Sequence, residues 1–108
     1  MSEVSIEDFL KLDFRIVEVT RADRIEHKPR ILAVEVEMGA EKRRIVVGGG
    51  EFYDPEFFVG KKMVLLRNLR PKKISGIESE GMLLAADVDG KPYWLQVEDG
   101  VPSGSKVR

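Results

Sequence analysis

From Phe14 onward, apolar and polar residues alternate in short runs, which is the pattern of β-strands with one buried face. The alternation is clearest from Val34 to Met38, and a turn at 39–41 leads into a third run that is predicted to pair with it as a hairpin. The polar, proline-containing segment 21–30 is predicted to be a loop, and 82–84 to be buried. Strands are predicted at 14–20, 31–38, 42–47, 63–68, 82–88 and 91–97, with a short terminal strand in 101–108.

Two short segments depart from the strand pattern and predict helices. Ser5 and Asp8 form a capping box for a short N-terminal helix. Asp54 is placed to cap a helical turn that begins with Pro55, between the third and fourth strands. The predicted fold is a single all-β domain, 1–108, built as a small five-stranded barrel with a short N-terminal helix, a small helix between strands three and four, and extra C-terminal strands. An open sandwich of two sheets is the alternative.

The composition is typical of a folded protein in a reducing compartment. The chain has no cysteine, a charged fraction of 34% and a formal net charge of −1, which excludes disulfides, thiolate metal sites and a bulk polycation. No apolar run approaches the ~20 residues that span a bilayer. The N-terminus carries acids where a signal peptide has cations. We therefore predict a cytoplasmic protein that is not associated with a membrane.

Positive charge is concentrated in one segment of the chain. Pro71 stiffens the backbone beside three of these cations, and a restrained cluster of cations is a phosphate-binding feature. A solvated loop without a partner is the alternative interpretation. The segment has no aromatic residue, so recognition of RNA backbone and shape is favoured over the reading of a loose strand. Between Lys61 and Ile77 there are six cations and no acid: Lys61, Lys62, Arg67, Arg70, Lys72 and Lys73.

The sequence shows no constellation for catalysis or metal binding. Glu78 and Glu80 form a weak candidate pair of carboxylates, and their serine and glycine neighbours indicate a turn. His27 is the single histidine, and it lies in a polar segment without other ligands. The chain is therefore predicted to be a binding protein that uses no cofactor or metal, and not an enzyme.

The segment 68–86, NLRPKKISGIESEGMLLAA, resembles the signature of the tRNA-binding domain family, found as an appendage of methionyl-tRNA synthetases and in stand-alone dimeric tRNA-binding proteins. The matching residues are Asn68, Arg70-Pro71-Lys72-Lys73 and the Gly76–Met82 run; FLKLDFRIVEV near the N-terminus also resembles the family. The resemblance implies an oligonucleotide/oligosaccharide-binding (OB) barrel that recognises tRNA by its shape. It also implies an aminoacyl-tRNA synthetase as a candidate partner.

Seven residues are candidates for tRNA contact: Arg15, Asn68, Arg70, Lys72, Lys73, Ser79 and Glu80. The cations at 70, 72 and 73 are expected to bind phosphates. Asn68 either hydrogen-bonds RNA or caps its own turn, and Arg15 either extends the basic face or forms a surface salt bridge. A carboxylate beside phosphates repels them unless it has another role, so we expect Glu78 or Glu80 to orient one of the three cations.

The late hairpin and the first helix are candidate contact surfaces with another protein. Tyr93, Trp94 and Leu95 are adjacent, so strand alternation turns at least one large side chain outward. Because stand-alone relatives are homodimers, the resemblance implies a dimer interface that includes this hairpin and Phe9. The alternative function is a chaperone-like protein that binds unfolded or exported polypeptides, which requires an exposed apolar groove and little salt dependence.

Overall fold

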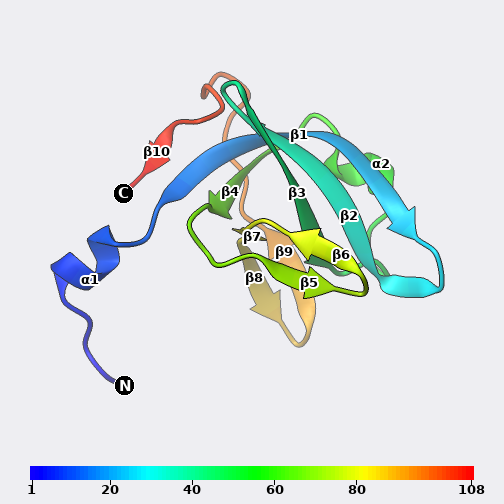
Figure 1. Cartoon of the computed structure of the whole chain (residues 1–108), viewed down its shortest axis with the longest axis horizontal. Coiled ribbons are helices and arrows are strands. Elements are labelled where there is room, and N and C mark those ends of the chain that lie inside the picture. Colours follow the sequence, from blue (N-terminus) through cyan, green and yellow to red (C-terminus); the bar gives the residue numbers. More distant parts are fainter.

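The computed structural model describes residues 1–108 and consists mainly of antiparallel strands (Figure 1). Strands β3, β2, β1, β4 and β7 lie side by side in that order, and β10 joins this sheet by pairing with β1. The hairpins β5–β6 and β8–β9 form two further small sheets. The elements are α1 (Ile6–Leu10), β1 (Phe14–Ile25), β2 (Lys28–Met38), β3 (Glu41–Gly48), α2 (Pro55–Phe58), β4 (Lys62–Leu66), β5 (Lys72–Ile74), β6 (Ile77–Ser79), β7 (Met82–Leu83), β8 (Ala85–Val88), β9 (Lys91–Trp94) and β10 (Lys106–Val107).

The all-β class is confirmed, with both short helices and the extra C-terminal strand in the expected places. Ser5 caps α1, since its Oγ accepts a hydrogen bond from the N–H of Asp8 at 3.1 Å. Pro55 begins α2, but the carboxylate of Asp54 makes no capping bond there. It pairs instead with Arg24, whose Nη2 lies 3.1 Å away. Neither helix has the length and apolar character needed to cross a membrane.

Strands β1 and β2 are longer than predicted, and the predicted loop at 21–30 is wrong. β1 continues to Ile25 and β2 begins at Lys28, so only two residues separate them, the second being His27 with φ of 63°. Most side chains at this end of the ribbon are exposed on both faces. The sequence there lacks apolar alternation because there is no core for one face to contact. A register shift at Thr20 marks a β-bulge, which bends the strand.

The core lies on the concave side of the sheet, where alternating side chains of β1 to β4 meet. Val17 and Val19 of β1 pack with Val34 and Val36 of β2 in a single cluster of 12 buried residues. α2 covers one end of this cluster with Phe58, which is 0% exposed. Truncating a buried phenylalanine of this kind to alanine typically costs about 3–5 kcal/mol of stability.

The sheet is not closed into a continuous barrel, in contrast to the prediction. β3 pairs only with β2, and β7 pairs only with β4, so two edges face each other without a ladder. Side chains bridge part of this gap. The Oγ of Ser79 accepts a hydrogen bond from the N–H of Val46 at 3.0 Å and donates to the carbonyl of Gly81 at 3.1 Å. Glu80 makes two further bonds to the backbone of Arg44, so residues 79–81 form the closing seam of the fold.

Each of the two small hairpins turns through two residues with positive φ. These are Ser75 (50°) and Gly76 (83°) in β5–β6, and Asp89 (50°) and Gly90 (87°) in β8–β9. Both are features of type I′ turns, whose twist matches that of the strands. The predicted continuous strand at 82–88 is divided, because residues 85–88 leave the main sheet to pair with β9.

Candidate nucleic-acid interface

The β5–β6 hairpin and the segment just before it carry the three cations that were predicted to bind phosphates. Arg70 precedes the hairpin and Lys72 and Lys73 lie on β5; all three are exposed. None of them forms an ion pair with a protein carboxylate. Their charges are therefore available to an external anion.

The three cations do not all face the same way. Arg70 and Lys72 line a groove, whereas Lys73 is not part of its lining. The difference follows from strand geometry, since successive side chains point to opposite faces of a strand. Lys73 lies on the outer face opposite Glu78, its partner in the β5–β6 register. The structure thus assembles two of the three predicted phosphate ligands on one rim.

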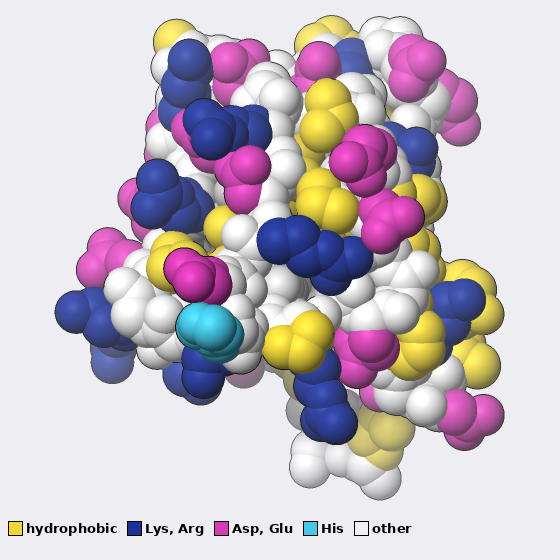
Figure 2. Space-filling view, turned by 90° about the vertical axis from the view of Figure 1, so that its right-hand side faces the viewer, with side chains coloured by type: hydrophobic (Ala, Val, Ile, Leu, Met, Phe, Trp, Pro, Cys, Tyr) yellow, Lys and Arg dark blue, Asp and Glu magenta, His cyan; other side chains and the backbone are white.

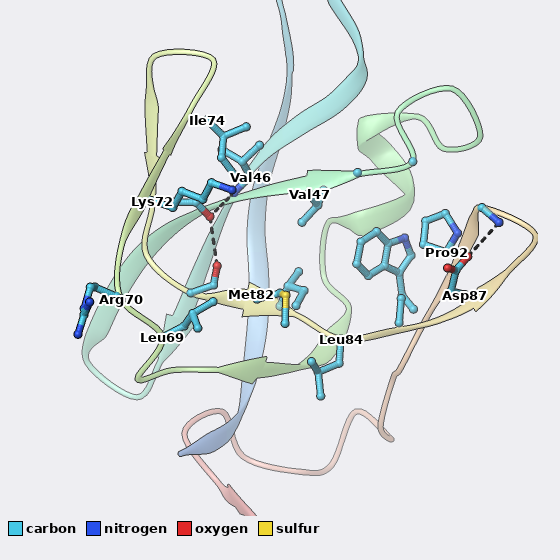
Figure 3. A pocket seen from close by; sticks show the side chains of 18 residues that line it. Val46, Val47, Leu69, Arg70, Lys72, Ile74, Met82, Leu84, Asp87 and Pro92 are labelled. Carbon is cyan, nitrogen blue, oxygen red and sulfur yellow. Dashed lines mark hydrogen bonds between the residues drawn. The ribbon is translucent and has the colours of Figure 1, made fainter. Parts of the chain in front are cut away.

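The groove lies between the two small hairpins and has a volume of about 690 Å³ (Figure 3). Lys72 and Ile74 of β5 lie on one side, and Asp87 and Pro92 of the β8–β9 hairpin lie on the other. Its floor is apolar and is formed by β3 and the segment around Met82. Arg70 lies at the outer end, beside Leu69.

Arg15 and Arg67, by contrast, belong to a half-buried ion network at the surface of the sheet. The Nε of Arg15 lies 2.7 Å from Asp13, and the two terminal nitrogens of Arg67 bind Asp13 at 3.2 Å and Glu41 at 2.8 Å. Arg43 completes the network, with its Nε 2.7 Å from Glu41. Arg15 therefore adopts the salt-bridge alternative, and its charge is compensated.

The network changes the proton affinity of its members. Burial raises the pKa of the Asp13 carboxyl, but hydrogen bonds and positive charge from Arg15 and Arg67 outweigh it and leave this pKa below its ordinary value. Hydrogen bonds from Arg67 and Arg43 lower the pKa of Glu41. Hydrogen bonds to Glu41 and Asp13, together with the negative charge of these carboxylates, raise the pKa of the Arg67 guanidinium. Charges held this tightly stabilise the scaffold that carries the groove.

Asn68 has a structural role in this protein. Its Oδ1 accepts a hydrogen bond from the N–H of Asp13 at 2.8 Å, and its Nδ2 donates to the carbonyl of Lys11 at 2.6 Å. The side chain thus fastens the segment between α1 and β1 to the end of β4. This long-range tie is neither of the two roles considered from the sequence.

The expected orientation of a cation by Glu78 or Glu80 is wrong. Neither carboxylate pairs with a cation of the hairpin, and the Oε1 of Glu80 accepts a hydrogen bond from the backbone N–H of Arg44 at 3.0 Å. Ser79 is only 5% exposed and is engaged at the closing seam. Both residues hold the hairpin against β3, which fixes the position of the cations on the opposite strand.

The sequence did not identify the apolar surface of the groove. Met82 and Leu84 were expected to be buried with Leu83, but Met82 is 46% exposed and Leu84 is half-buried. Leu69 is also exposed and lines the groove. Apolar residues in a predicted strand are expected to be buried. The exposure of Met82 and Leu84 could have been predicted only by recognising that the strand 82–88 is divided into β7 and β8.

Charges elsewhere on the surface are mixed. The face that includes the β1–β2 turn shows basic and acidic side chains close together (Figure 2). Arg21 lies 2.7 Å from Asp23, and Arg30 lies 3.9 Å from Glu51. Such neighbouring opposite charges attract a polyanion weakly, so these paired charges contrast with the unpaired Arg70, Lys72 and Lys73.

A family model described as "Putative tRNA binding domain" matches residues 14–106, which include all of the sheet except Val107 of β10, both hairpins and the groove. The chain belongs to this tRNA-binding domain family. The resemblance found in the sequence is thus confirmed, and the family is a binding domain without catalytic function.

Two methionine–tRNA ligases are among the relatives of this tRNA-binding domain. The ligase of Caldanaerobacter subterraneus is 42% identical over 104 residues, which cover 96% of this chain and 16% of the ligase. The ligase of Archaeoglobus fulgidus is 45% identical over 105 residues, covering 97% of this chain and 16% of the ligase. The chain therefore spans about a sixth of the length of these relatives.

Two solved structures share the fold of the tRNA-binding domain over its full length. A MetRS-related protein from Pyrococcus horikoshii has a TM-score of 0.95 at 36% identity, with complete coverage of both chains. The chaperone CsaA from Bacillus anthracis has a TM-score of 0.90 at 28% identity and covers 99% of this chain and 100% of its own. The fold thus occurs in proteins described by two different functions.

The residues predicted for a dimer interface occupy different environments in the tRNA-binding domain. Tyr93 and Leu95 are exposed, whereas Trp94 is half-buried and packs on Phe58 with a centroid separation of 5.6 Å. Phe9 is partly exposed and contacts Phe14, with ring centroids 6.1 Å apart. Alternation along β9 was correctly predicted to turn large side chains outward.

Proposed function

We propose that this domain binds tRNA through the basic rim of the groove, with Arg70 and Lys72 contacting phosphates and Lys73 assisting from the outer face of the hairpin. The single observation that carries the proposal is the presence of three exposed, unpaired cations on, and just before, one hairpin that the seam fixes to the sheet. A fixed cluster loses little conformational freedom when it binds phosphates, which favours affinity.

The proposal predicts moderate salt dependence of binding. Arg15 and Arg67 are compensated by carboxylates, so the face offers about three free cations. Neutralising about three phosphates gives a slope of log K against log salt of roughly −2 to −3. A polypeptide ligand held by apolar contacts would give a slope near zero.

The experiment is a fluorescence-anisotropy titration with bulk tRNA, an unstructured RNA of matched length and a denatured polypeptide, each at two salt concentrations. The double variant Arg70→Ala/Lys72→Ala is expected to weaken tRNA binding at least tenfold, and Lys73→Ala to weaken it less. The matched control is Lys106→Ala/Arg108→Ala, which removes two exposed cations from the C-terminal end. Equal effects of the two double variants would show that the hairpin is not the site.

The relatives support a proposal for the cellular setting. The related methionine–tRNA ligases contain a matching domain as a small part of a longer chain. We therefore infer that this domain increases the affinity of a synthetase for its tRNA in the cytoplasm. It would act either as a trans-acting subunit or as part of a longer protein. Co-purification of the domain with a synthetase in the presence and absence of tRNA tests this inference.

A homodimer is part of the proposal. α1 has no buried residue, and Ile6 and Leu10 are largely exposed on it. Phe9, with Tyr93, Trp94 and Leu95 of the late hairpin, is the predicted interface. Because Trp94 is turned inward, we expect Tyr93 and Leu95 to contribute the outward contacts. Light scattering measures the molar mass of the unmodified domain and of the variants Phe9→Ser and Tyr93→Ser/Leu95→Ser. A fall from dimer to monomer mass in a variant would show that its surface forms the interface.

Binding of unfolded polypeptides is the second candidate function. Two observations favour it: the likeness to the chaperone CsaA and the apolar floor of the groove. In the titration above, this function predicts that the denatured polypeptide binds at both salt concentrations and competes with tRNA.

A further inference from the structure

The proposed phosphate contacts use only the rim of the groove and leave its interior without a role. Half of its 18 lining residues are hydrophobic, and Leu69 and Met82 are 44% and 46% exposed within it. Its volume of about 690 Å³ lies in the range of sites for small organic groups, about 300–1,000 Å³. A concave surface with exposed large apolar side chains is typical of a binding site.

The charges on the two walls of the groove differ in sign. Lys72 lies on the wall formed by the β5–β6 hairpin, with Arg70 at the outer end of that wall, and Asp87 lies on the opposite wall. The Asp87 carboxylate is held in place, because its Oδ1 accepts a hydrogen bond from the N–H of Gly90 at 2.9 Å. An anionic chain is therefore attracted to one wall and repelled from the other, while uncharged groups that donate hydrogen bonds suit the Asp87 side.

The interior also offers an aromatic ring and a free strand edge. Trp94 lines the groove, and its buried Nε1 has no hydrogen-bond acceptor. Beyond Val46, whose N–H is bonded to Ser79 at the seam, the edge of β3 at Val47 and Gly48 has no partner strand. Planar groups with polar edges, such as nucleobases, can use both an apolar surface and a backbone edge of this kind.

We propose that the groove binds one or two unpaired nucleosides of the tRNA, with their phosphates on Arg70 and Lys72 and their bases over Met82 and Trp94. This inference rests on the proposed tRNA binding and specifies which part of the RNA enters the site. Binding of this kind differs from recognition of the RNA backbone and shape alone, because a base can enter the groove only where the RNA is not paired. An extended polypeptide would also fit an apolar groove, but it has no general need for two cations on one wall.

Trp94 is the only tryptophan of the chain, so its fluorescence reports on the groove directly. Titration with tRNA is expected to change Trp94 emission in parallel with the anisotropy signal for binding. A short single-stranded RNA should produce the same change, whereas a blunt RNA duplex and a base-free sugar–phosphate oligomer of equal length should not. Binding of tRNA without a response of Trp94, or an equal response to the base-free oligomer, would overturn the inference.

A pair of variants tests the groove independently of fluorescence. Leu69→Ala/Met82→Ala removes exposed apolar surface from the groove and should weaken tRNA binding about tenfold without changing the salt slope. The control Val59→Ala/Val88→Ala removes exposed apolar side chains from outside the groove and should have no effect. Thermal unfolding of each variant verifies that the fold is intact.

The outcomes separate the inference from the proposed function. If tRNA does not bind the unmodified domain, the proposed function fails. If tRNA binds in a manner that depends on Arg70 and Lys72, but neither Leu69→Ala/Met82→Ala nor Trp94 emission responds, only the inference about the groove fails. If a denatured polypeptide alters Trp94 emission at every salt concentration and the short RNA does not, the occupant is a polypeptide and the inference is overturned.

Discussion

Glu80 and Arg44 form a reciprocal pair across the open edge of the sheet. The N–H of Glu80 donates to the carbonyl of Arg44 at 2.9 Å, and the Oε1 of Glu80 accepts from the N–H of Arg44 at 3.0 Å. The Glu80 carboxylate thus accepts the hydrogen bond that a backbone carbonyl of a neighbouring strand would accept in a regular β-ladder. Together with Ser79, this pair joins β3 to the end of the β5–β6 hairpin, so the same three residues complete the fold and fix the position of the candidate site.

The seam predicts different effects for two neighbouring glutamates. Glu80→Ala removes the acceptor for the Arg44 N–H and should lower the free energy of unfolding by about 1–3 kcal/mol. Glu78→Ala is the matched control, because Glu78 is exposed and makes no ion pair or side-chain hydrogen bond; it should change stability by less than about 0.5 kcal/mol. Urea unfolding of both variants measures the difference. Equal effects would show that the seam contributes little to stability.

Arg67 is predicted to act on stability more than on RNA binding. Arg67→Ala leaves Asp13 and Glu41 without one of their cationic partners and should cost about 1–3 kcal/mol, allowing for the partial exposure of all three side chains. tRNA affinity should fall less than in Arg70→Ala/Lys72→Ala, because the guanidinium of Arg67 is already engaged. A larger loss of affinity in Arg67→Ala, with unchanged stability, would place this arginine in the RNA site.

The network also predicts a dependence of stability on pH in acid. The pKa values of Asp13 and Glu41 are lower in the folded protein than their ordinary values of 3.8 and 4.5. The unfolded chain therefore binds more protons in this range, and stability rises with pH. The contribution of these two carboxylates to stability is fully present when the pH is above their ordinary pKa values. It is lost as the pH falls through their lower pKa values in the folded protein.

Unfolding temperature measured between about pH 2 and pH 7 tests this dependence. The double variant Asp13→Asn/Glu41→Gln should be less stable at neutral pH and should lose less stability on acidification. The control Glu98→Gln/Asp99→Asn changes two exposed carboxyls that form no ion pair, and it should keep the acid dependence of the unmodified domain. Parallel curves for the two double variants would contradict the role of the network.

The sequence predicted the fold well where one face of a strand is buried. Alternation from Val34 to Met38 reflects contact with the core, and Asp89-Gly90 reflects a turn that needs positive φ. The extension of β1 to Ile25 could not be predicted, because that end of the ribbon has no buried face to impose a period. Closure of the barrel was predicted from strand number, but the backbone of β3 is joined to residues 79 and 80, just before β7, by three hydrogen bonds instead of a strand ladder.

The candidate site was predicted less completely than the fold. The motif located the cations correctly in the chain, yet a linear motif does not separate residues that bind a ligand from those that support them. Ser79 and Glu80 hold the hairpin, and Asn68 holds the segment between α1 and β1, through bonds to backbone groups 33 to 57 residues away. Contacts over such separations depend on the tertiary fold and leave no local signature in the sequence.

Gly81 gives the last prediction, because the closing seam depends on its lack of a side chain. It has φ of 142°, and a Cβ atom there would lie 2.9 Å from the carbonyl oxygen of Leu66. Gly76 also has positive φ, at 83°, but a Cβ atom there would meet nothing within 4 Å. Gly76→Ala should therefore cost only the backbone strain of about 1–2 kcal/mol, whereas Gly81→Ala adds a clash with β4 and should cost more. Urea unfolding compares the two variants, and a similar loss in both would show that β4 and β7 can move apart without disturbing the seam.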